Sequence, residues 1–429
     1  MQGMRARPDA LRNRSFLLLW IAQAISQTAQ NIINFVLIIE VEERSRSSTA
    51  TSLVVLSFII PAVVFGPIAG VFVDRTDKRR MLVVTNFLRA GAVLAYIVID
   101  RSWPLPTALL IIYLLSAVFS TISQFFAPAE ASAIPLLVSK EQLPEANSLF
   151  SLTYNSAQVA GFAFIGPLFV KLTTIRSIFF VVSSLYLICT LLVALLPALP
   201  QGVRPEVPTS LAASLRKTVG EIYDLWRFIT SHRLITTAIV DLAITAAIFL
   251  MLGTLGVGLV TRVMKLPASN LAYILAAGGI GLLIGLFMVP RVISHIRGKV
   301  LIDVGMVAMG MAILGMAVIQ VILSYLLGTL PLRAQSELTL LIVMFLALCM
   351  GIGSAFVSIP AQTLLQQESP PSIRGRVFAS LFAFSSALAI LPVLFTGALA
   401  DIIGLQQVMA LIGVVTLILA AVGHYRSLD

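Results

Sequence analysis

The chain of 429 residues is 59% hydrophobic and only 11% charged, and its mean hydropathy is +1.00. Soluble globular domains are about 45–50% apolar and about 25% charged. So few charges cannot cover a water-facing surface. The composition therefore excludes soluble enzymes, DNA-binding domains and disordered scaffolds, and it indicates a protein embedded in a lipid bilayer.

The net charge of +10 does not indicate a nucleic-acid partner. The charges lie in short clusters between long apolar runs, without the interleaved aromatic residues of a nucleic-acid groove. Cys189 and Cys349 both lie inside apolar runs, which predicts neither a disulfide framework nor a metal centre. The sequence contains no phosphate-binding loop of the Gly-x4-Gly-Lys-Ser/Thr type. We therefore expect no cofactor, no metal and no direct use of ATP.

Twelve apolar runs are long enough to cross a membrane, which takes about 20 residues. The first exceeds the apolar core of a signal peptide, so we expect it to remain as a span. The predicted fold class is an all-α membrane protein of twelve transmembrane helices in two six-helix bundles. The runs lie near 16–39, 51–73, 82–99, 106–127, 146–170, 175–196, 234–260, 270–292, 300–327, 338–359, 375–398 and 404–424.

The distribution of Lys and Arg predicts the orientation of these spans. With the amino terminus inside, twenty of these residues fall in the inner segments and eight in the outer loops. Inner loops carry the excess of positive charge in membrane proteins. We therefore expect a multi-pass protein of the cell (inner) membrane with both termini in the cytoplasm.

A polar gap at 197–233 separates the sixth span from the seventh. Prolines at its start stop the sixth helix, and apolar residues then recur every three or four positions from Leu211 to Ile229, with Trp226 among them. This pattern predicts an amphipathic helix at the cytoplasmic membrane interface. The predicted domains are residues 1–196, a linker at 197–233, and residues 234–429.

The two halves repeat weakly. Phe126 to Glu130, which read Phe-Ala-Pro-Ala-Glu, are echoed by Ser-Ile-Pro-Ala-Gln at Ser358 to Gln362, and Gly166 is echoed by Gly397. The offsets are 232 and 231 residues. Two repeated six-helix halves are typical of rocking transporters, whose substrate site lies between the halves near the midplane of the membrane.

The segment from Gly70 to Arg80 reads Gly-Val-Phe-Val-Asp-Arg-Thr-Asp-Lys-Arg-Arg. It resembles the signature loop of the major facilitator superfamily: a glycine, three residues, Asp-Arg, and a basic cluster. The family usually has glycine where this chain has Asp77. The resemblance extends over the whole chain and implies the fold of that family and alternating-access transport.

Four further segments make the chain most similar to the macrolide-efflux and enterobactin-exporter branch of the superfamily. They are Phe-Ala-Pro-Ala-Glu-Ala-Ser-Ala-Ile-Pro at 126–135, Leu-Pro-Glu-Ala-Asn at 143–147, Ile-Pro-Ala-Gln-Thr-Leu-Leu-Gln at 359–366, and Arg-Gly-Arg-Val-Phe at 374–378.

The signature loop contains the candidate gating residues. Gly70 allows two helices to approach closely. Asp74 is placed to face the amino-terminal end of span eleven, which carries partial positive charge, and the resemblance implies that this contact latches the cytoplasmic side. The alternative is that the basic residues only fix the topology. The candidate gating set is Gly70, Asp74, Arg75, Arg79, Arg374 and Arg376.

Amides follow one face of the first span at steps of 4, 3 and 4 residues. Such a stripe is costly against lipid, so it either bonds neighbouring helices or lines a wet cavity. We assign it to a substrate cavity. The candidate cavity residues are Gln23, Gln27, Gln30, Asn31, Asn34, Asn155, Gln158 and Thr245.

Acidic residues inside the spans are the candidates for proton coupling. Asp241 lies about eight residues into span seven, where a carboxylate costs about 2.5–3.5 kcal/mol on insertion scales. It is either a proton carrier or a static hydrogen-bonded group. Glu130, at the end of span four, is the second candidate, or it forms a structural pair with Arg89.

Span five carries part of the glycine-rich motif of the antiporter members of the family. Gly166 and Pro167 match, whereas Phe169 and Val170 replace the final glycines. Span four lacks the arginine that many proton-coupled members carry. The resemblance to an antiporter is therefore incomplete.

These features predict a secondary active transporter that exports an amphipathic small molecule, of the drug, macrolide or siderophore class, by proton antiport. Its expected partners are that substrate, protons and the lipid bilayer, and we expect a monomer. A lysophospholipid or other lipid transporter of the same fold is the first alternative. A non-transporting membrane receptor or assembly factor is the second.

Overall fold

The computed structural model describes residues 9–100, 102–199, 227, 231–293, 295–326, 331–368 and 374–425. Within these ranges the side chains of residues 9, 67, 71, 74, 233, 332, 374–386, 424 and 425 are not described. By their contacts the residues form two units, one of Met1–Glu40 with Ser57–Gly220 and one of Val41–Leu56 with Glu221–Asp429. Helices α1 and α2 each run from one unit into the other.

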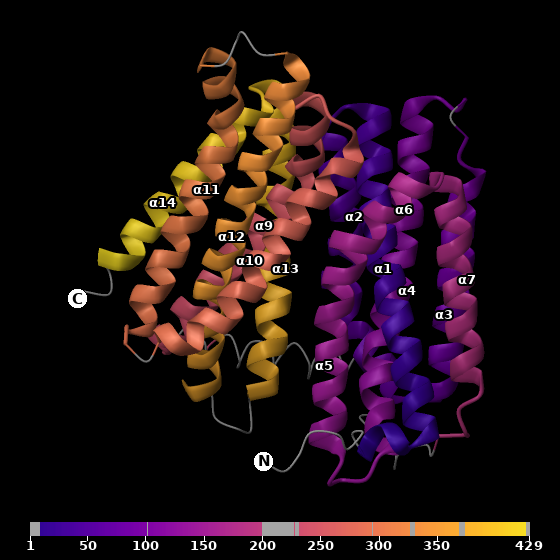
Figure 1. Ribbon diagram of the computed structural model, residues 1–429. Helices are drawn as coiled ribbons and strands as arrows, with labels where there is room; N and C mark the ends of the chain where they lie inside the picture. The colour runs from indigo at the N-terminus through magenta and orange to yellow at the C-terminus, as the bar shows by residue number, and fades with distance from the viewer. Residues whose placement is uncertain are drawn as a thin grey trace. The chain divides into compact units, whose positions relative to one another are not determined.

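The first half of the chain forms the helices drawn from indigo to magenta in Figure 1. A six-residue π-helix, Ala160–Ile165, joins α5 to α6, so that the two make one interrupted rod. The helices are α1 (Arg14–Ser45), α2 (Ser48–Asp74), α3 (Lys78–Ala95), α4 (Leu105–Leu137), α5 (Leu143–Val159), α6 (Gly166–Leu172) and α7 (Ile175–Ala194).

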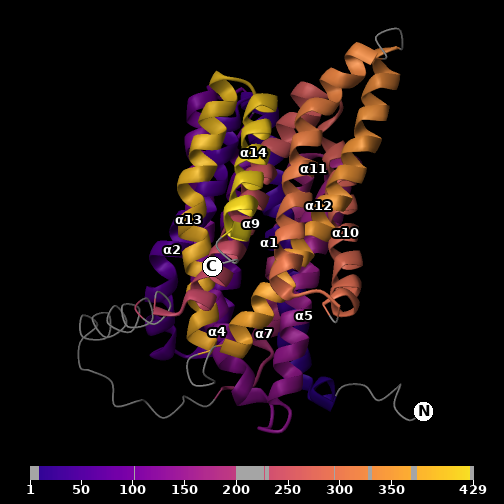
Figure 2. The same cartoon turned by 90° about the vertical axis from the view of Figure 1, so that its left-hand side faces the viewer.

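The second half forms the helices drawn from orange to yellow. In Figure 2, α10, α11 and α12 lie side by side, and α11 also packs against α14. Helix α9 ends in a π-helix, Leu259–Val263. The helices are α9 (Arg233–Gly258), α10 (Leu271–Val292), α11 (Gly298–Leu326), α12 (Leu332–Glu368), α13 (Arg374–Ile402) and α14 (Leu405–Tyr425).

Each of the twelve expected spans coincides with a helical rod in the described part of the chain. Ten of these rods are long and apolar enough to cross a membrane by themselves, and Ala387–Ile402 is a shorter apolar helix. The rod α5–α6 is not among these ten, because the π-helix interrupts it. The predicted fold class, all-α with twelve helices, is confirmed. The expected interfacial helix over 211–229 lies outside the described residues except for Arg227.

Side-chain caps begin several of the helices at polar residues between the apolar runs. Asn13 Oδ1 accepts from the backbone N–H groups of Ser15 and Phe16 at the start of α1. Asp77 Oδ1 accepts from the N–H of Arg80, 2.9 Å away, at the start of α3. A cap supplies a partner for N–H groups that the first turn leaves open. Asp77, where the family usually has glycine, therefore serves as the cap of α3.

Helix α1 packs at very short range against the π-helix Ala160–Ile165 and the start of α6 inside the first unit. A Cβ on Gly161 would lie 2.7 Å from Asn31 Cβ and 2.8 Å from the carbonyl oxygen of Thr28. A Cβ on Gly166 would lie 3.0 Å from the ring of Phe35. Gly161 and Gly166 therefore allow the two backbones to approach closely.

Candidate functional site

The amide face of α1 divides into buried and half-buried members. Gln23 and Gln27 are buried, and Gln30, Asn31 and Asn34 are half-buried. Gln23 Nε2 donates to the carbonyl oxygen of Phe150 on α5, 3.3 Å away, and Asn31 Nδ2 donates to Gln27 O within α1. Gln23 Oε1 and Asn34 Oδ1 are buried without a hydrogen-bond partner. Gln23 therefore joins two helices, while unmet acceptors remain along the stripe.

The candidate cavity residues outside α1 differ in exposure. Asn155 and Gln158, on α5, are exposed, and Asn155 Nδ2 donates to Ser151 O of its own helix at 2.7 Å. Thr245 on α9 is buried, and its hydroxyl donates to the backbone oxygen of Asp241 at 2.8 Å. The hydroxyl of Thr245 thus bonds its own helix.

Arg89 lies in the core of the first unit and is 1% exposed. Its Nη1 donates to Ser26 Oγ on α1 at 2.9 Å, and its Nη2 donates to Ser123 O on α4 at 3.3 Å. The guanidinium carbon lies 4.3 Å from the ring centroid of Phe126. Among these contacts none joins Arg89 directly to Glu130, whose Oε1 is buried without a partner. The structural pair expected between them is therefore not a direct ion pair, because hydroxyl, carbonyl and ring groups surround the guanidinium.

The residues next to Asp241 in the sequence are apolar, but in the structure a charged side chain lies beside its carboxylate. Its Oδ2 lies 3.9 Å from Lys299 Nζ on α11, and the same ammonium lies 3.1 Å from Oδ1 of Asp303, one turn further along α11. We call Asp241, Lys299 and Asp303 the Asp241 triad. Two carboxylates share one ammonium in it. Lys299 was not among the candidate residues, and its position four residues before Asp303 was the signal for the pair.

The signature loop is organised by its own backbone. Lys78 Nζ donates to the carbonyl oxygens of Val73, 2.7 Å away, and Thr76, 3.1 Å away, at the end of α2. Arg79 Nη2 donates to the carbonyl oxygen of Ala194 at the end of α7. Cations at helix carboxyl ends complement the helix dipole and satisfy open carbonyls. Arg75 is exposed.

The proposed latch lies largely outside the described side chains. Asp74 ends α2, and Arg374 and Arg376 lie in the first turn of α13, but the side chains of all three are outside the described set. Gly70 has no described atom within 4 Å of the place where a Cβ would be. Close helix packing, the reason expected for a glycine at this position, is therefore not found at Gly70, whose neighbours leave room for a side chain.

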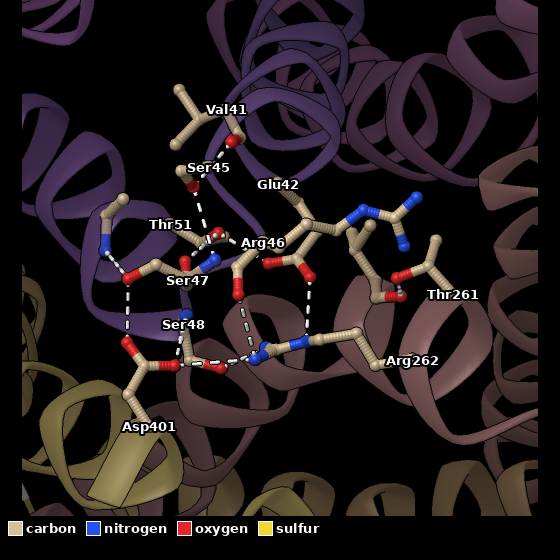
Figure 3. Close-up of polar contacts among 12 residues, drawn as sticks. Val41, Glu42, Ser45, Arg46, Ser47, Ser48, Thr51, Thr261, Arg262 and Asp401 are labelled. Carbon is tan, nitrogen blue, oxygen red and sulfur yellow. Dashed lines mark hydrogen bonds and ion pairs between the residues drawn. The ribbon is translucent and has the colours of Figure 1, made fainter. Parts of the chain in front are cut away.

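A polar cluster in the second unit was not predicted from the sequence. Arg262, in the π-helix that ends α9, lies with its Nε 2.9 Å from Oε1 of Glu42 and with its Nη1 3.3 Å from Oδ1 of Asp401 (Figure 3). The carboxylate of Glu42 is 0% exposed. Thr51 Oγ1 donates to Glu42 Oε2 at 3.0 Å. One guanidinium thus holds a carboxylate from α1 and a carboxylate from α13.

Asp401 caps the first turn of α2 in the same cluster (Figure 3). Its carboxylate accepts from Ser47 Oγ at 2.6 Å, the N–H of Ser48 at 2.8 Å, and the N–H and hydroxyl of Thr49 at 2.9 and 2.7 Å. Arg262 also donates to Ser48 Oγ and to the carbonyl oxygen of Arg46. We name this group the Arg262 cluster: Glu42, Arg46, Ser47, Ser48, Thr49, Thr51, Arg262 and Asp401.

Backbone geometry supports the Arg262 cluster on both sides. Arg46 has a φ of +50°, which turns the chain between α1 and α2. The π-helix carries Arg262, and Gln320 Nε2 of α11 donates to the carbonyl oxygen of Val263 at 2.5 Å. A Cβ on Gly397 would collide with Ser52 Oγ, so α13 approaches the start of α2 very closely. The signal in the sequence was Glu42, a carboxylate at the end of an apolar run.

The comparison with known families decides what kind of protein this is. The sequence matches the Major Facilitator Superfamily over residues 19–332. The chain belongs to that superfamily. The expected family is confirmed, and so is the expectation of a membrane transporter rather than an enzyme, because the family consists of secondary transporters.

Two curated relatives show how far the sequence similarity extends. The uncharacterized MFS-type transporter YfiS of Bacillus subtilis is 24% identical over 378 residues, which is 86% of this chain and 84% of that protein. Macrolide efflux protein A of Streptococcus pyogenes is 29% identical over 145 residues, only 32% of this chain and 35% of that protein. The similarity to macrolide efflux protein A is therefore partial.

Solved structures of the same fold cover nearly the whole chain. A bacterial homologue of the human lysosomal transporter Spinster, in an inward-facing and unoccupied conformation, has a TM-score of 0.72 at 14% identity and covers 98% of this chain and 97% of its own. A bacterial homologue of the iron transporter ferroportin has a TM-score of 0.70 at 17% identity, with 96% and 98% covered. At these identities the likeness concerns the fold alone.

Proposed function

We propose that this member of the superfamily exports an amphipathic small molecule from the cell in exchange for protons. The partial similarity to macrolide efflux protein A supports export of drug-like or macrolide-like molecules. The excess of Lys and Arg in the predicted inner loops supports cytoplasmic termini. The transporter then works by alternating access.

The observation that carries the proton coupling is the Asp241 triad. Asp303 holds Lys299 at 3.1 Å, whereas Asp241 lies 3.9 Å from the same ammonium. Two carboxylates lie beside the ammonium of Lys299 near the end of a membrane span, where charge is expensive. Asp241 is the member that a proton neutralises with the least loss of an existing contact. A proton bound there on one side of the membrane and released on the other couples the two fluxes.

The amide residues fit the substrate cavity of this proposal. Gln27, Gln30 and Asn34 on α1, with Asn155 and Gln158 on α5, offer donors and acceptors to a polar part of the substrate. The unmet oxygen of Asn34 is the strongest single support, because buried polar atoms without partners are rare. Asn31 and Thr245 bond within their own helices and act from the edge of the cavity.

The two gates of the cycle lie, in this proposal, at opposite ends of the spans. Asp74, with Arg75, Arg79, Arg374 and Arg376, forms the latch on the cytoplasmic side that the family resemblance implies. The Arg262 cluster lies at the ends of α1 and α9 that the orientation places outside. It holds the α1–α2 turn to α9 and α13 at that end of the second unit.

A transport panel tests this function. The purified protein in proteoliposomes is offered macrolides, catecholate siderophores, cationic dyes and lysophospholipids, each with and without an imposed pH gradient. Uptake of a macrolide, siderophore or dye that a pH gradient accelerates supports the proposal. Movement of lysophospholipid alone would replace it with the lipid transporter, and movement of no solute at all would favour the receptor.

A further inference from the structure

The core of the first unit contains a layer of well-paired polar side chains around Arg89. Its guanidinium donates to Ser26 Oγ on α1 and Ser123 O on α4, and it lies over the ring of Phe126. Tyr186 on α7 donates its hydroxyl to Ser26 O at 3.4 Å. Four helices thus meet at this level, and both terminal nitrogens of Arg89 are hydrogen-bonded.

A second polar layer lies one helical turn nearer the start of α1. On α7, Cys189 follows Tyr186 by three residues and donates to Ala22 O, four residues before Ser26 and so about 6 Å along α1. On α3, Asn86 precedes Arg89 by three residues, and on α4, which runs the opposite way, Glu130 follows Phe126 by four. Asn86 and Glu130 therefore lie at the depth of Cys189, on neighbouring helices.

Several polar side-chain atoms of this second layer lack hydrogen-bond partners, whereas the terminal nitrogens of Arg89 in the first layer have them. Both side-chain atoms of Asn86, Oδ1 and Nδ2, are buried without a hydrogen bond, and so are Oε1 of Glu130 and Nε of Arg89. Asn86, Glu130 and Arg89 are 0%, 5% and 1% exposed, respectively. Four unmet polar atoms on two packed helices, three of them in the second layer and one on Arg89 in the first, are far more than a folded core usually leaves.

The chemistry of the four atoms selects the ligand. Asn86 Nδ2 and Arg89 Nε are donors, and Asn86 Oδ1 and Glu130 Oε1 are acceptors. A metal cation would be repelled by the guanidinium of Arg89 and would leave both donors unmet. Water donates and accepts, and a buried water usually makes about three hydrogen bonds.

We propose that water bound in this layer bridges Asn86, Arg89 and Glu130, and that the carboxyl group of Glu130 exchanges its proton through that water. Arg89 on α3 and Cys189 on α7 interact electrostatically with Glu130, Tyr186 on α7 interacts with Arg89, and α1 contributes the neutral Ser26, which is bonded to Arg89. The water site stands on the geometry alone. Its use as a second proton site in the transport cycle rests on the proposed function.

Two measurements on the purified protein, without substrate or gradient, test the site. Radiolytic hydroxyl labelling marks side chains beside ordered internal water, and it should oxidise Cys189 and Phe126 in the wild type although both are buried. In Asn86→Leu, which removes two of the four polar atoms at similar volume, labelling of both should fall several-fold. Wild-type labelling at the level of buried residues elsewhere, such as Phe179, would overturn the proposal.

Infrared difference spectroscopy in H₂O and D₂O tests the proton exchange. A carbonyl band of a protonated carboxyl group should shift on D₂O exchange, vary with pH, and disappear in Glu130→Gln. The exposed Glu141→Gln is the matched control and should leave the band unchanged. If Glu130→Gln removes no carboxyl band at any pH, and leaves only the band that Asp241 would give, the exchange at Glu130 is contradicted. If the band behaves as expected but transport ignores pH gradients, only the proposed function fails.

Discussion

Arg262 lies with its Nε 2.9 Å from Oε1 of Glu42, a carboxylate with no exposed surface, and its Nη1 reaches Asp401 at 3.3 Å. The partners belong to α9, α1 and α13, which are remote in sequence. A buried charge that loses its partner is strongly destabilising, whereas exposed pairs contribute little. All three residues belong to the second unit, which includes Val41–Leu56.

Removing the guanidinium should release this contact. We expect Arg262→Ala to destabilise the protein by about 3–5 kcal/mol, because the charge of Glu42 is left buried. The loss should appear as a lower melting temperature in detergent. Engineered cysteines near Ser48 should also react faster with a membrane-impermeant thiol reagent added from outside.

The matched control is Arg333→Ala. Arg333 pairs with Glu337 at 3.0 Å, but the two side chains are 88% and 61% exposed, so its loss should cost less than about 1 kcal/mol. Equal melting temperatures for the two variants would show that the Arg262 cluster stabilises the protein no more than an exposed ion pair does.

Gly161 lies so close to α1 that even an alanine at this position should destabilise the protein. Gly161→Ala places a Cβ 2.7 Å from Asn31 and 2.8 Å from Thr28, and overpacking of this kind costs about 1–3 kcal/mol. Gly91→Ala on α3 meets nothing within 4 Å and should be neutral or stabilising by up to about 1 kcal/mol. Thermal unfolding of the two variants side by side measures the difference, and the same melting temperature in both would refute the close packing.

Because Asp77 caps α3, substitutions at this position should destabilise the protein to different degrees. Asp77→Ala removes the acceptor for the N–H of Arg80 and should cost about 1 kcal/mol, whereas Asp77→Gly, the residue usual in the family, should cost only a few tenths. Asp77→Asn keeps an acceptor oxygen and should behave nearly as the wild type. If unfolding curves show that Asp77→Gly is less stable than Asp77→Ala, Asp77 does not stabilise the protein by capping α3.

The structure also separates members of the amide face by accessibility. Cysteines placed at Asn155 or Gln158, which are exposed on α5, should react with hydrophilic thiol reagents if water reaches them, and bound substrate should slow the reaction. A cysteine at Gln23, which is buried against α5, should react much more slowly. Rapid labelling of Gln23 with none at Asn155 would show that α5 faces lipid and that the cavity lies elsewhere.

The fold was predictable because the hydropathy of the sequence is sufficient to locate membrane helices. The prediction used twelve apolar runs, a polar gap and the distribution of positive charge. These are local features of the sequence, so they can be found without knowledge of the tertiary structure. Helix ends were less predictable. Helix α12 runs to Glu368, well beyond the apolar run near 338–359, because its last turns are polar and still helical.

The sites were harder to predict because their members are distant in sequence. Asp241 was singled out, but its partner Lys299 is 58 residues away and looked like part of a basic loop. Glu42, Arg262 and Asp401 each resembled ordinary charged ends of spans, and only the packed structure joins them. Single residues inside apolar runs could be found, whereas polar networks could not.

Gradient-driven export by Asp241→Asn tests the central claim most directly. The assay compares wild type, Asp241→Asn and the exposed control Glu337→Gln in proteoliposomes with an imposed pH gradient, using the substrate that the panel identifies. We expect Asp241→Asn to lose uphill export while it keeps substrate binding and downhill exchange, because a neutral amide resembles the protonated acid in shape and charge. Glu337→Gln should export as the wild type does. Full gradient-driven export by Asp241→Asn would contradict the account.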